Sequence, residues 1–247
     1  MNYLVIASLT CLLVICQFST AQKPSLSKDL SDEAIKQKRE VYQKNLSTLQ
    51  QFRITNAKAH KRASANEKKI ILNKIRTHLE SELSQNIFPA WFGTPWDFNG
   101  ISKTPGEGKI ACGYFVSTCL VHVGFKVSRI RLAQQPSQRI IRTFMERSAM
   151  DISSKRSLPD LKKQLINSGD GIYIVGLDTH TGFVTVKDEA ITFVHSSYYK
   201  TPKRCVVAEP YDSKNPLADS KYRVFGKLFH DDMLIKWLNE TPYKVAR

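Results

Sequence analysis

The spacing of apolar residues predicts two helices in the first third of the chain. One apolar stripe recurs every four residues: Ile71, Ile75, Leu79 and Leu83. This spacing places the four side chains on one face of a helix, where they can pack into a core. Ser64 and Glu67 precede the stripe in the arrangement of a capping box, so the helix is expected to begin there. An earlier helix is expected over 31–57, with a polar face rich in Lys and Gln.

Shorter patterns occupy the second half of the chain. Runs rich in β-branched and aromatic residues predict strands at 173–175, 182–186, 191–195, 204–207 and 222–228. Helical patterns lie at 136–145, 158–166 and 231–239. Helices that precede a mostly antiparallel sheet are typical of the α+β class, which is the fold class that we expect.

The first residues of the chain predict export. Residues 4–16 are apolar, a run that suits a signal peptide and is shorter than the roughly twenty residues of a membrane span. Small residues at Ser19 and Ala21 predict cleavage before Gln22. We therefore expect a signal peptide at 1–21, a helical extension at 22–63 and one domain at 64–247. The protein would be periplasmic or secreted, without stable membrane insertion after cleavage; an uncleaved anchor is the alternative.

The net charge indicates which kinds of partner to expect, and the cysteines indicate whether a free thiol is present. The formal net charge is +15 and residues 1–21 carry none of it, so the exported chain would favour polyanions such as anionic lipids or acidic polymers. The densest aromatic and basic stretch, 198–204, has no recognition-helix or stacking pattern around it, so no nucleic acid partner is expected. The sequence contains no cofactor or metal motif. Cys119 and His122 are a lone pair on one helix, which is a poor metal site. The odd number of cysteines after position 21 predicts a free thiol and leaves a bridge between Cys119 and Cys205 open.

Cys112 is the strongest candidate for chemistry. A loop rich in Gly and Pro, 104–109, precedes it, and an apolar helical pattern follows it and ends at Gly124. The thiol therefore falls in the first turn of a helix, where unpaired N–H groups and the macrodipole favour an anion. We expect a lowered thiol pKa there, which would make Cys112 a nucleophile at neutral pH. The alternative is a core cysteine in the helical stripe at positions 112, 115, 119 and 123.

Two histidines are predicted to lie together on a β-hairpin. A turn at 187–188 pairs His180 directly with His195, whereas a turn at 188–189 pairs His195 with Gly182 and leaves His180 as its diagonal neighbour. Both registers put the imidazoles on one face of the sheet, roughly 5–8 Å apart. A base whose ring is oriented by a second polar group is what nucleophilic catalysis needs. The alternative is a pair of solvated histidines at strand ends.

Five short segments resemble, in order, motifs of the NlpC-type, papain-like cysteine peptidases, which cut bacterial cell-wall peptides. Gly-Thr-Pro-Trp-Asp-Phe-Asn-Gly at 93–100 resembles the family's Gly-Thr-Pro-Tyr-x-Trp-Gly-Gly, and Ala-Cys-Gly-Tyr-Phe-Val at 111–116 resembles Asp-Cys-Ser-Gly-Phe-Val. Gly-Asp-Gly at 169–171 stands where the family has Gly-Asp-Leu. His-Thr-Gly-Phe-Val at 180–184 resembles His-Val-Gly-Ile-Tyr, and Phe-Val-His-Ser-Ser at 193–197 resembles Phe-Ile-His-Ala-Ser. The resemblance covers roughly 64–228.

This resemblance implies a papain-like NlpC-type fold, in which an antiparallel sheet packs on helices and the nucleophile begins a helix. It implies that Cys112 is the nucleophile, His180 the base and His195 the orienting residue. It places three further side chains at the substrate: Trp96, Asp97 and Tyr114. The implied substrate is the stem peptide of peptidoglycan, cut next to its γ-D-glutamyl residue, with peptidoglycan or muropeptides as the partner and no cofactor.

The chain departs from the family pattern around the site. Ala111 and Gly113 replace Asp and Ser, and Trp96 replaces a Tyr that lines the pocket, so an indole that can only donate stands there. An insertion is expected near 128–156. Two other functions stay open: a papain-like acyl hydrolase or transferase acting on lipids or esters, and a non-catalytic basic binding module. Lys and Arg around the cleft of a stem-peptide hydrolase would make cleavage of muropeptides slower at high ionic strength.

Overall fold

The computed structural model describes residues 24–200 and 204–246, so the signal peptide expected at 1–21 lies outside the described residues. The internal contacts divide the chain into two units, Met1–Lys36 and Gln37–Arg247. Gln37, where the second unit begins, lies within the segment expected as a helical extension at 22–63. In the described ranges, no helix has both the length and the apolar content that crossing a membrane requires.

Helices and strands alternate irregularly along the chain. The helical segments are α1 (Pro24–Arg62), α2 (Ala65–Ser81), the π-helix η1 (Glu82–Ile87), α3 (Phe88–Trp91), α4 (Cys112–His122), α5 (Arg129–Ala133), α6 (Ser137–Arg142), the 3₁₀ turn η2 (Arg147–Ala149), α7 (Leu158–Asn167), α8 (Pro216–Asp219) and α9 (Asp231–Leu238). The strands are β1 (Met150–Ser154), β2 (Gly171–Leu177), β3 (Thr181–Lys187), β4 (Ala190–Ser196), β5 (Val206–Pro210) and β6 (Tyr222–Lys227).

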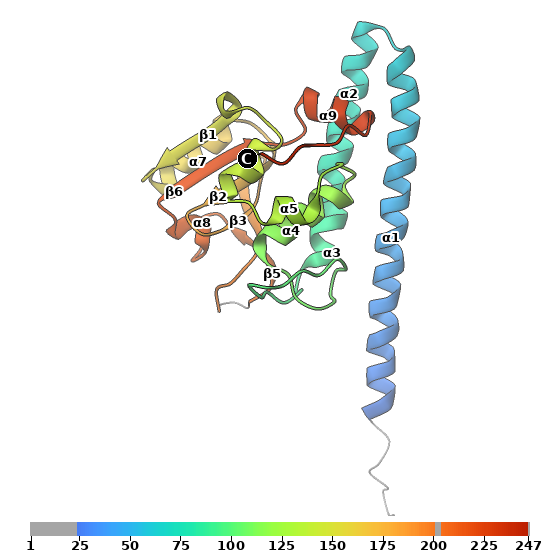
Figure 1. The fold of residues 1–247 in the computed structure, drawn as a ribbon. Coiled ribbons are helices and arrows are strands. Elements are labelled where there is room, and N and C mark those ends of the chain that lie inside the picture. Colours follow the sequence, from blue (N-terminus) through green and yellow to red (C-terminus); the bar gives the residue numbers. More distant parts are fainter. Residues whose placement is uncertain (1–23, 201–203, 247) are drawn as a thin grey trace, which may run out of the picture. The chain divides into compact units, whose positions relative to one another are not determined.

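The strands form one antiparallel sheet in the order β1-β6-β2-β3-β4-β5 (Figure 1). This sheet and the helices around it confirm the predicted α+β class. Strand β1 lies inside the expected insertion, where the sequence predicted no strand. The strand expected at 204–207 is β5, which begins at Val206 and continues to Pro210.

The β3–β4 hairpin adopts the second of the two predicted registers. Phe183 pairs with Val194 and Lys187 with Ala190, which leaves Asp188 and Glu189 as a two-residue loop. Both loop residues have left-handed φ angles, 48° and 63°. A type I′ turn requires positive φ at both positions and matches the twist of the two strands. The same register continues to place Gly182 opposite His195.

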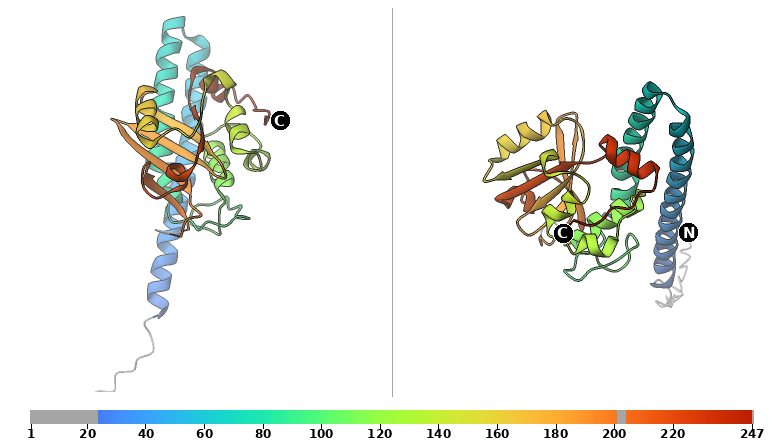
Figure 2. Two further views of the ribbon diagram at one scale, coloured as in Figure 1. Left: turned by 90° about the vertical axis from the view of Figure 1, so that its left-hand side faces the viewer. Right: turned by 45° about the horizontal axis from the view of Figure 1, so that its top comes forward.

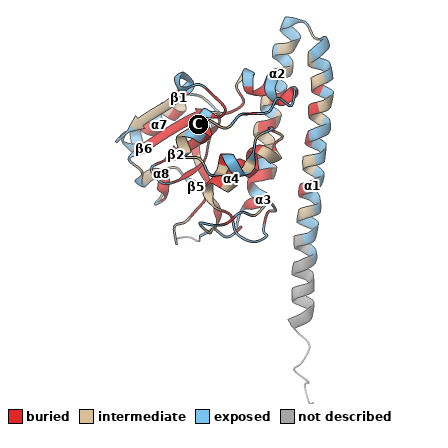
Figure 3. Ribbon diagram, in the orientation of Figure 1, coloured by how far each residue is buried: buried red, intermediate tan, exposed pale blue. Residues whose placement is uncertain are grey.

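Both faces of the sheet are covered, which is why β2 is buried along its whole length. Successive side chains of a strand point to opposite faces. Ile172 and Ile174 belong to the core shared with α4, whereas Tyr173 and Val175 pack with the apolar side of α7. Figure 2 shows α7 on one side of the sheet and α2 and α4 on the other, and Figure 3 shows how much of the strands is buried.

Helix α4 lies in the larger core and packs against β3 and β4. Phe115, Val116 and Cys119 have no exposed surface, so the helix is fixed by apolar contacts around most of its circumference. Its capping residue is Val123, whose carbonyl accepts a 2.8 Å hydrogen bond from the Trp237 indole. Tight packing along its length holds the first residue of α4, Cys112, in a fixed place.

Residues 37–62 of α1 run antiparallel to α2, which begins with the predicted capping box at Ser64 (Figure 1). Tyr42 and Leu49 are each only 3 % exposed and belong to the larger core. The Tyr42 hydroxyl donates to His122 Nδ1 of α4 at 2.7 Å and accepts from the Trp91 indole at 3.2 Å. This part of α1 is therefore an integral part of the compact unit.

Candidate active site

Cys112 is the first residue of α4, and Ala111 before it is extended. The backbone N–H groups of Cys112, Gly113 and Thr181 reach its sulfur. Thr181 comes from the start of β3, so the helix and the hairpin meet at the thiol. Gly113 is required by packing, because a Cβ there would lie 2.4 Å from the carbonyl oxygen of Ala133 in α5. A Ser at this position, as in the motif that the sequence resembles, would meet the same carbonyl.

His180 and His195 are brought together on one face of the hairpin. His180 ends a tight turn in which the Leu177 N–H donates to the His180 carbonyl at 2.8 Å. The His180 Nε2 lies 2.8 Å from the Nδ1 of His195. Gly182 allows this approach, since a Cβ there would lie 2.8 Å from the Cβ of His195 and 2.7 Å from the Phe193 ring. Both histidines are almost fully buried, at 3 % and 0 % exposure.

Glu209 is a fourth member of this chain of polar groups, and the sequence analysis did not find it. Its Oε2 lies 3.1 Å from the Nε2 of His195. In the β4–β5 register, Glu209 pairs with Phe193 and is the diagonal neighbour of His195 on the same face. The sequence signal was an acidic residue two positions beyond the predicted end of a strand, which only the register of β5 connects with His195.

The order of donors and acceptors follows from Glu209. An ionised carboxylate only accepts, so His195 donates from Nε2 and its Nδ1 becomes an acceptor. His180 then donates from Nε2, and its Nδ1 keeps a free lone pair. That Nδ1 is buried and has no hydrogen-bond partner among the described residues. An unsatisfied buried acceptor is costly, and it is the atom that a general base needs.

Burial sets the charge state of the site. It lowers the pKa of His180 well below 6.5, with a smaller effect from His195 in the same direction, and lowers the pKa of His195 to about 3. Burial also raises the pKa of Glu209. Burial is the largest effect at Cys112 as well, and it raises the pKa of the thiol despite the three N–H groups around the sulfur. The lowered thiol pKa expected from the helix terminus is therefore wrong: the resting pair is a thiol and a neutral imidazole.

Cys112 and His180 line one cavity of about 270 Å³. Part of its wall comes from the segment expected as an insertion, which forms α5 and α6 here and contributes Ala133, Gln135, Pro136, Ser137 and Ile140. A second cavity of about 140 Å³ shares His180 and is also lined by Tyr198 and Asp219. Asp178 lines both cavities. Among the described residues, neither cavity is lined by Lys or Arg, in contrast to the basic cleft expected from the sequence.

Trp96 reaches the site through Tyr198. The Tyr198 ring lies 5.2 Å from the His180 ring and 6.0 Å from the Trp96 ring, measured between centroids. The Arg204 guanidinium lies over the Trp96 ring at 5.7 Å. The Trp96 Nε1 is buried and has no hydrogen-bond partner in the part of the chain that the structure describes. Trp96 is therefore close to the site, but Tyr198 lies between it and His180. The sequence analysis had not assigned Tyr198 to the site.

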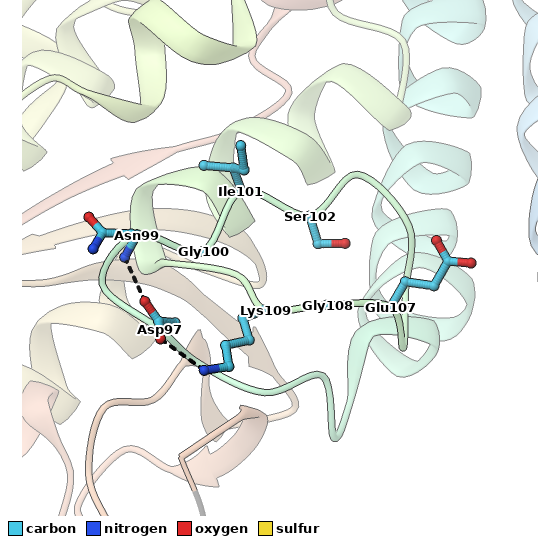
Figure 4. Close-up of a pocket in the computed structure, with 8 residues that line it drawn as sticks. All are labelled: Asp97, Asn99, Gly100, Ile101, Ser102, Glu107, Gly108 and Lys109. Atoms are coloured by element: carbon cyan, nitrogen blue, oxygen red, sulfur yellow. Dashed lines mark hydrogen bonds and ion pairs between the residues drawn. The ribbon is translucent and has the colours of Figure 1, made fainter.

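The other two residues expected at the substrate lie elsewhere. Asp97 lines a separate cavity of about 530 Å³ in the loop before α4, where it forms an ion pair with Lys109 at 3.1 Å (Figure 4). Tyr114 lies under the Arg129 guanidinium at 4.9 Å and does not line the cavity at Cys112. Arg129 also donates to the Ile101 and Ser102 carbonyls, so Tyr114 helps to hold this loop on α4.

The remaining candidates for chemistry have structural surroundings. Cys119 is a fully buried free thiol on α4, so it is not bridged to Cys205. His122 accepts from Tyr42, and burial lowers its pKa to about 4. No group of three or more His, Cys, Asp or Glu that could hold a metal ion occurs within 24–200 and 204–246. Residues 201–203 of the basic stretch lie outside the described residues.

Comparison with known proteins does not identify a family or a function for this chain. No protein-family model, no curated protein and no solved structure matches this chain. The resemblance to NlpC-type peptidases therefore rests on the five short sequence motifs alone.

Proposed function

We propose that this chain is an exported cysteine hydrolase with a papain-like NlpC-type fold, which cuts amide bonds in peptidoglycan stem peptides. One observation carries the proposal. The buried Nδ1 of His180 has no hydrogen-bond partner among the described residues, His180 lines the same cavity as Cys112, and Nε2 of the same ring is held by His195. A nucleophile, a base and an orienting group in this order are the parts of a catalytic triad.

The reaction follows from these positions. The sulfur of Cys112 attacks the amide carbonyl carbon while its proton passes to Nδ1 of His180. The N–H groups at the start of α4 offer hydrogen bonds to the oxyanion. His180 then gives the proton to the leaving amine, the C–N bond breaks and a thioester remains. Water attacks the thioester, its proton passes to His180 and returns to sulfur, and the carboxylic acid product leaves.

The neutral resting pair affects how the nucleophile is activated. Because the thiol pKa is raised and the His180 pKa is lowered, proton transfer accompanies attack and does not precede it as a standing ion pair. Glu209 and His195 then stabilise the imidazolium that forms on His180 during the step. Glu209 and His195 therefore have two roles: they orient the His180 ring, and they stabilise its positive charge during the reaction.

The substrate class is supported by the order of the five motifs and by the apolar run at 4–16, which predicts export. The net charge of +15 favours association with an anionic polymer such as the cell wall. The cavities at His180, which are lined by Asp178 and Asp219, favour a neutral or cationic group next to the scissile bond. A stem peptide provides amide bonds that have neutral and cationic groups nearby.

The test uses purified muropeptides and phospholipid vesicles as separate substrates, with mass spectrometry of the products. Wild-type protein is expected to release stem-peptide fragments, and Cys112→Ala is expected to release none. Cys119→Ala is the matched control, because it removes a thiol from the same helix away from the site. Lipid products without muropeptide products would assign the chain as an acyl hydrolase, and no turnover of either would leave a binding module.

A further inference from the structure

Three large apolar side chains are exposed on the loop before α4 and at the start of α5. Phe98 is 80 % exposed, Ile101 is 59 % exposed and Ile130 is 54 % exposed. Together they are called the loop surface. Single exposed apolar residues are ordinary, and Ile70 on α2 is one such residue at 67 % exposure. Three of them in neighbouring segments need an explanation.

Hydrogen bonds connect the two segments that carry these side chains. The Gly100 N–H donates to the Asp97 carbonyl at 3.0 Å, so Phe98 stands at the tip of a tight turn that leads directly into Ile101. Arg129, the neighbour of Ile130, donates to the Ile101 carbonyl at 2.7 Å. Figure 4 shows Ile101 on the same loop as Asn99, with its side chain pointing away from the Asp97–Lys109 ion pair.

Basic residues outnumber acidic ones in the segment that carries the loop surface. Segment 92–142 contains seven Lys or Arg residues, of which Lys126 pairs with Glu240, and only two acidic residues, Asp97 and Glu107. Both acidic residues are neutralised by ion pairs, Asp97 with Lys109 at 3.1 Å and Glu107 with Arg39 at 2.5 Å. Exposed cations at Lys103 and Arg131 remain without an acidic partner among the described residues.

We propose that the loop surface docks the protein on an anionic lipid bilayer, with Phe98 and Ile101 inserted among the headgroups. Apolar tips ringed by cations are what shallow insertion into an anionic membrane uses. A soluble polyanion would explain the cations but would gain nothing from the exposed Phe98 ring. The proposal concerns binding and stands apart from the proposed hydrolase activity.

Docking in this way holds the active site close to the membrane. The Ala111 N–H donates to the Gly100 carbonyl at 2.9 Å, so the loop surface is tied to the residue that precedes Cys112. The cleft would then act on substrate that lies next to the bilayer, whatever bond it cuts.

The position of Trp96 provides a local test. It is half-buried and two residues from Phe98, whereas the other two tryptophans, Trp91 and Trp237, are at most 1 % exposed. Full-length protein is mixed with vesicles of phosphatidylglycerol and phosphatidylcholine that carry brominated acyl chains, and quenching of tryptophan fluorescence is measured. Quenching that disappears in Trp96→Phe is assigned to the loop, even if other parts of the chain also bind lipid.

We expect quenching of Trp96 by vesicles that contain phosphatidylglycerol, little quenching by pure phosphatidylcholine, and weaker quenching as NaCl rises from about 0.1 to 0.5 M. The double variant Phe98→Ser, Ile101→Ser should lower the loop's partition constant about tenfold, whereas Ile70→Ser should not change it. Equal quenching in the double variant and in wild type would overturn the proposal. An absence of quenching with anionic vesicles would also overturn it. Heparin serves as the soluble polyanion: if the protein bound heparin but no vesicles, the cations would be assigned to a soluble polyanion.

Discussion

Replacement of Glu209 by Gln tests the order of donors and acceptors at the site. Gln keeps the size of the side chain and an oxygen that can accept from His195, but it removes the negative charge and introduces an N–H donor. If that N–H donates to Nε2 of His195, the chain of hydrogen bonds reverses. His180 would then carry its proton on Nδ1, where it can no longer accept a proton from Cys112.

The size of the effect follows from the contact that is lost. Glu209 lies 3.1 Å from Nε2 of His195, which lies 0 % exposed in the core. A hydrogen bond to a charged group contributes about 1.5–3 kcal/mol, and this contribution grows as His180 becomes cationic in the transition state. We therefore expect Glu209→Gln to lower kcat/KM by about 10- to 150-fold, since 1.4 kcal/mol is a factor of about ten.

The assay is the pH profile of kcat/KM, with nitrogen NMR of the histidine rings as a second readout. Wild-type activity should fall as pH falls through a value below 6.5, because burial lowers the His180 pKa. Without the carboxylate the imidazolium is less stable, so this limb should move to still lower pH in Glu209→Gln. Glu189→Gln, which removes an exposed charge from the hairpin turn, should leave the profile unchanged.

The reasoning would be refuted by a Glu209→Gln enzyme with wild-type kcat/KM and an unchanged acid limb. It would equally be refuted if the rate fell only in proportion to the fraction of unfolded protein, because Glu209 would then be merely structural. The NMR spectrum should show protonated Nε2 and unprotonated Nδ1 on His180 in wild type at neutral pH.

Three further predictions concern His195, Gly182 and His122. His195→Asn should retain more activity than His195→Ala, because an amide oxygen can still accept from His180, and equal rates would show that His195 does not orient the base. Gly182→Ala should lower kcat/KM at least about tenfold and cost roughly 1–3 kcal/mol of stability, since its Cβ would lie 2.8 Å from that of His195; wild-type kinetics would contradict the close approach. Burial lowers the His122 pKa to about 4, so the unfolded state binds more protons between pH 4 and 6.5 and the free energy of unfolding falls as pH falls. His122→Gln should flatten this slope by up to about 1.4 kcal/mol per pH unit in denaturant titrations, and an unchanged slope would show that His122 is protonated in the folded state.

The sequence predicted those parts of the site that depend on local pattern. Residues after the 104–109 loop had to begin a helix, so Cys112 was placed at its first turn, and the hairpin brought the two histidines to one face. The choice between two registers depended on which residues adopt positive φ, and the sequence allowed both. Asp188 and Glu189 adopt it, and this selects the diagonal arrangement of His180 and His195.

Features that depend on distant segments were not predictable in this way. Glu209 meets His195 only because β5 pairs with β4 after the nine-residue connection 197–205, and no periodicity in the sequence predicts that register. Gly113 is required by a carbonyl of α5, in a segment that the sequence marked only as an insertion. The helix terminus argued for a lowered thiol pKa, but burial by surrounding segments has the larger effect and raises it.

Trapping of the acyl-enzyme tests the central proposal most directly. Wild-type protein and a muropeptide are mixed, quenched in acid within the first turnover and mapped by mass spectrometry. We predict an added acyl group on the peptide that contains Cys112, removed by hydroxylamine as a thioester is, and absent from Cys112→Ala. Release of product at the wild-type rate by Cys112→Ala, or an acyl group found on Cys119 instead, would contradict the proposed mechanism.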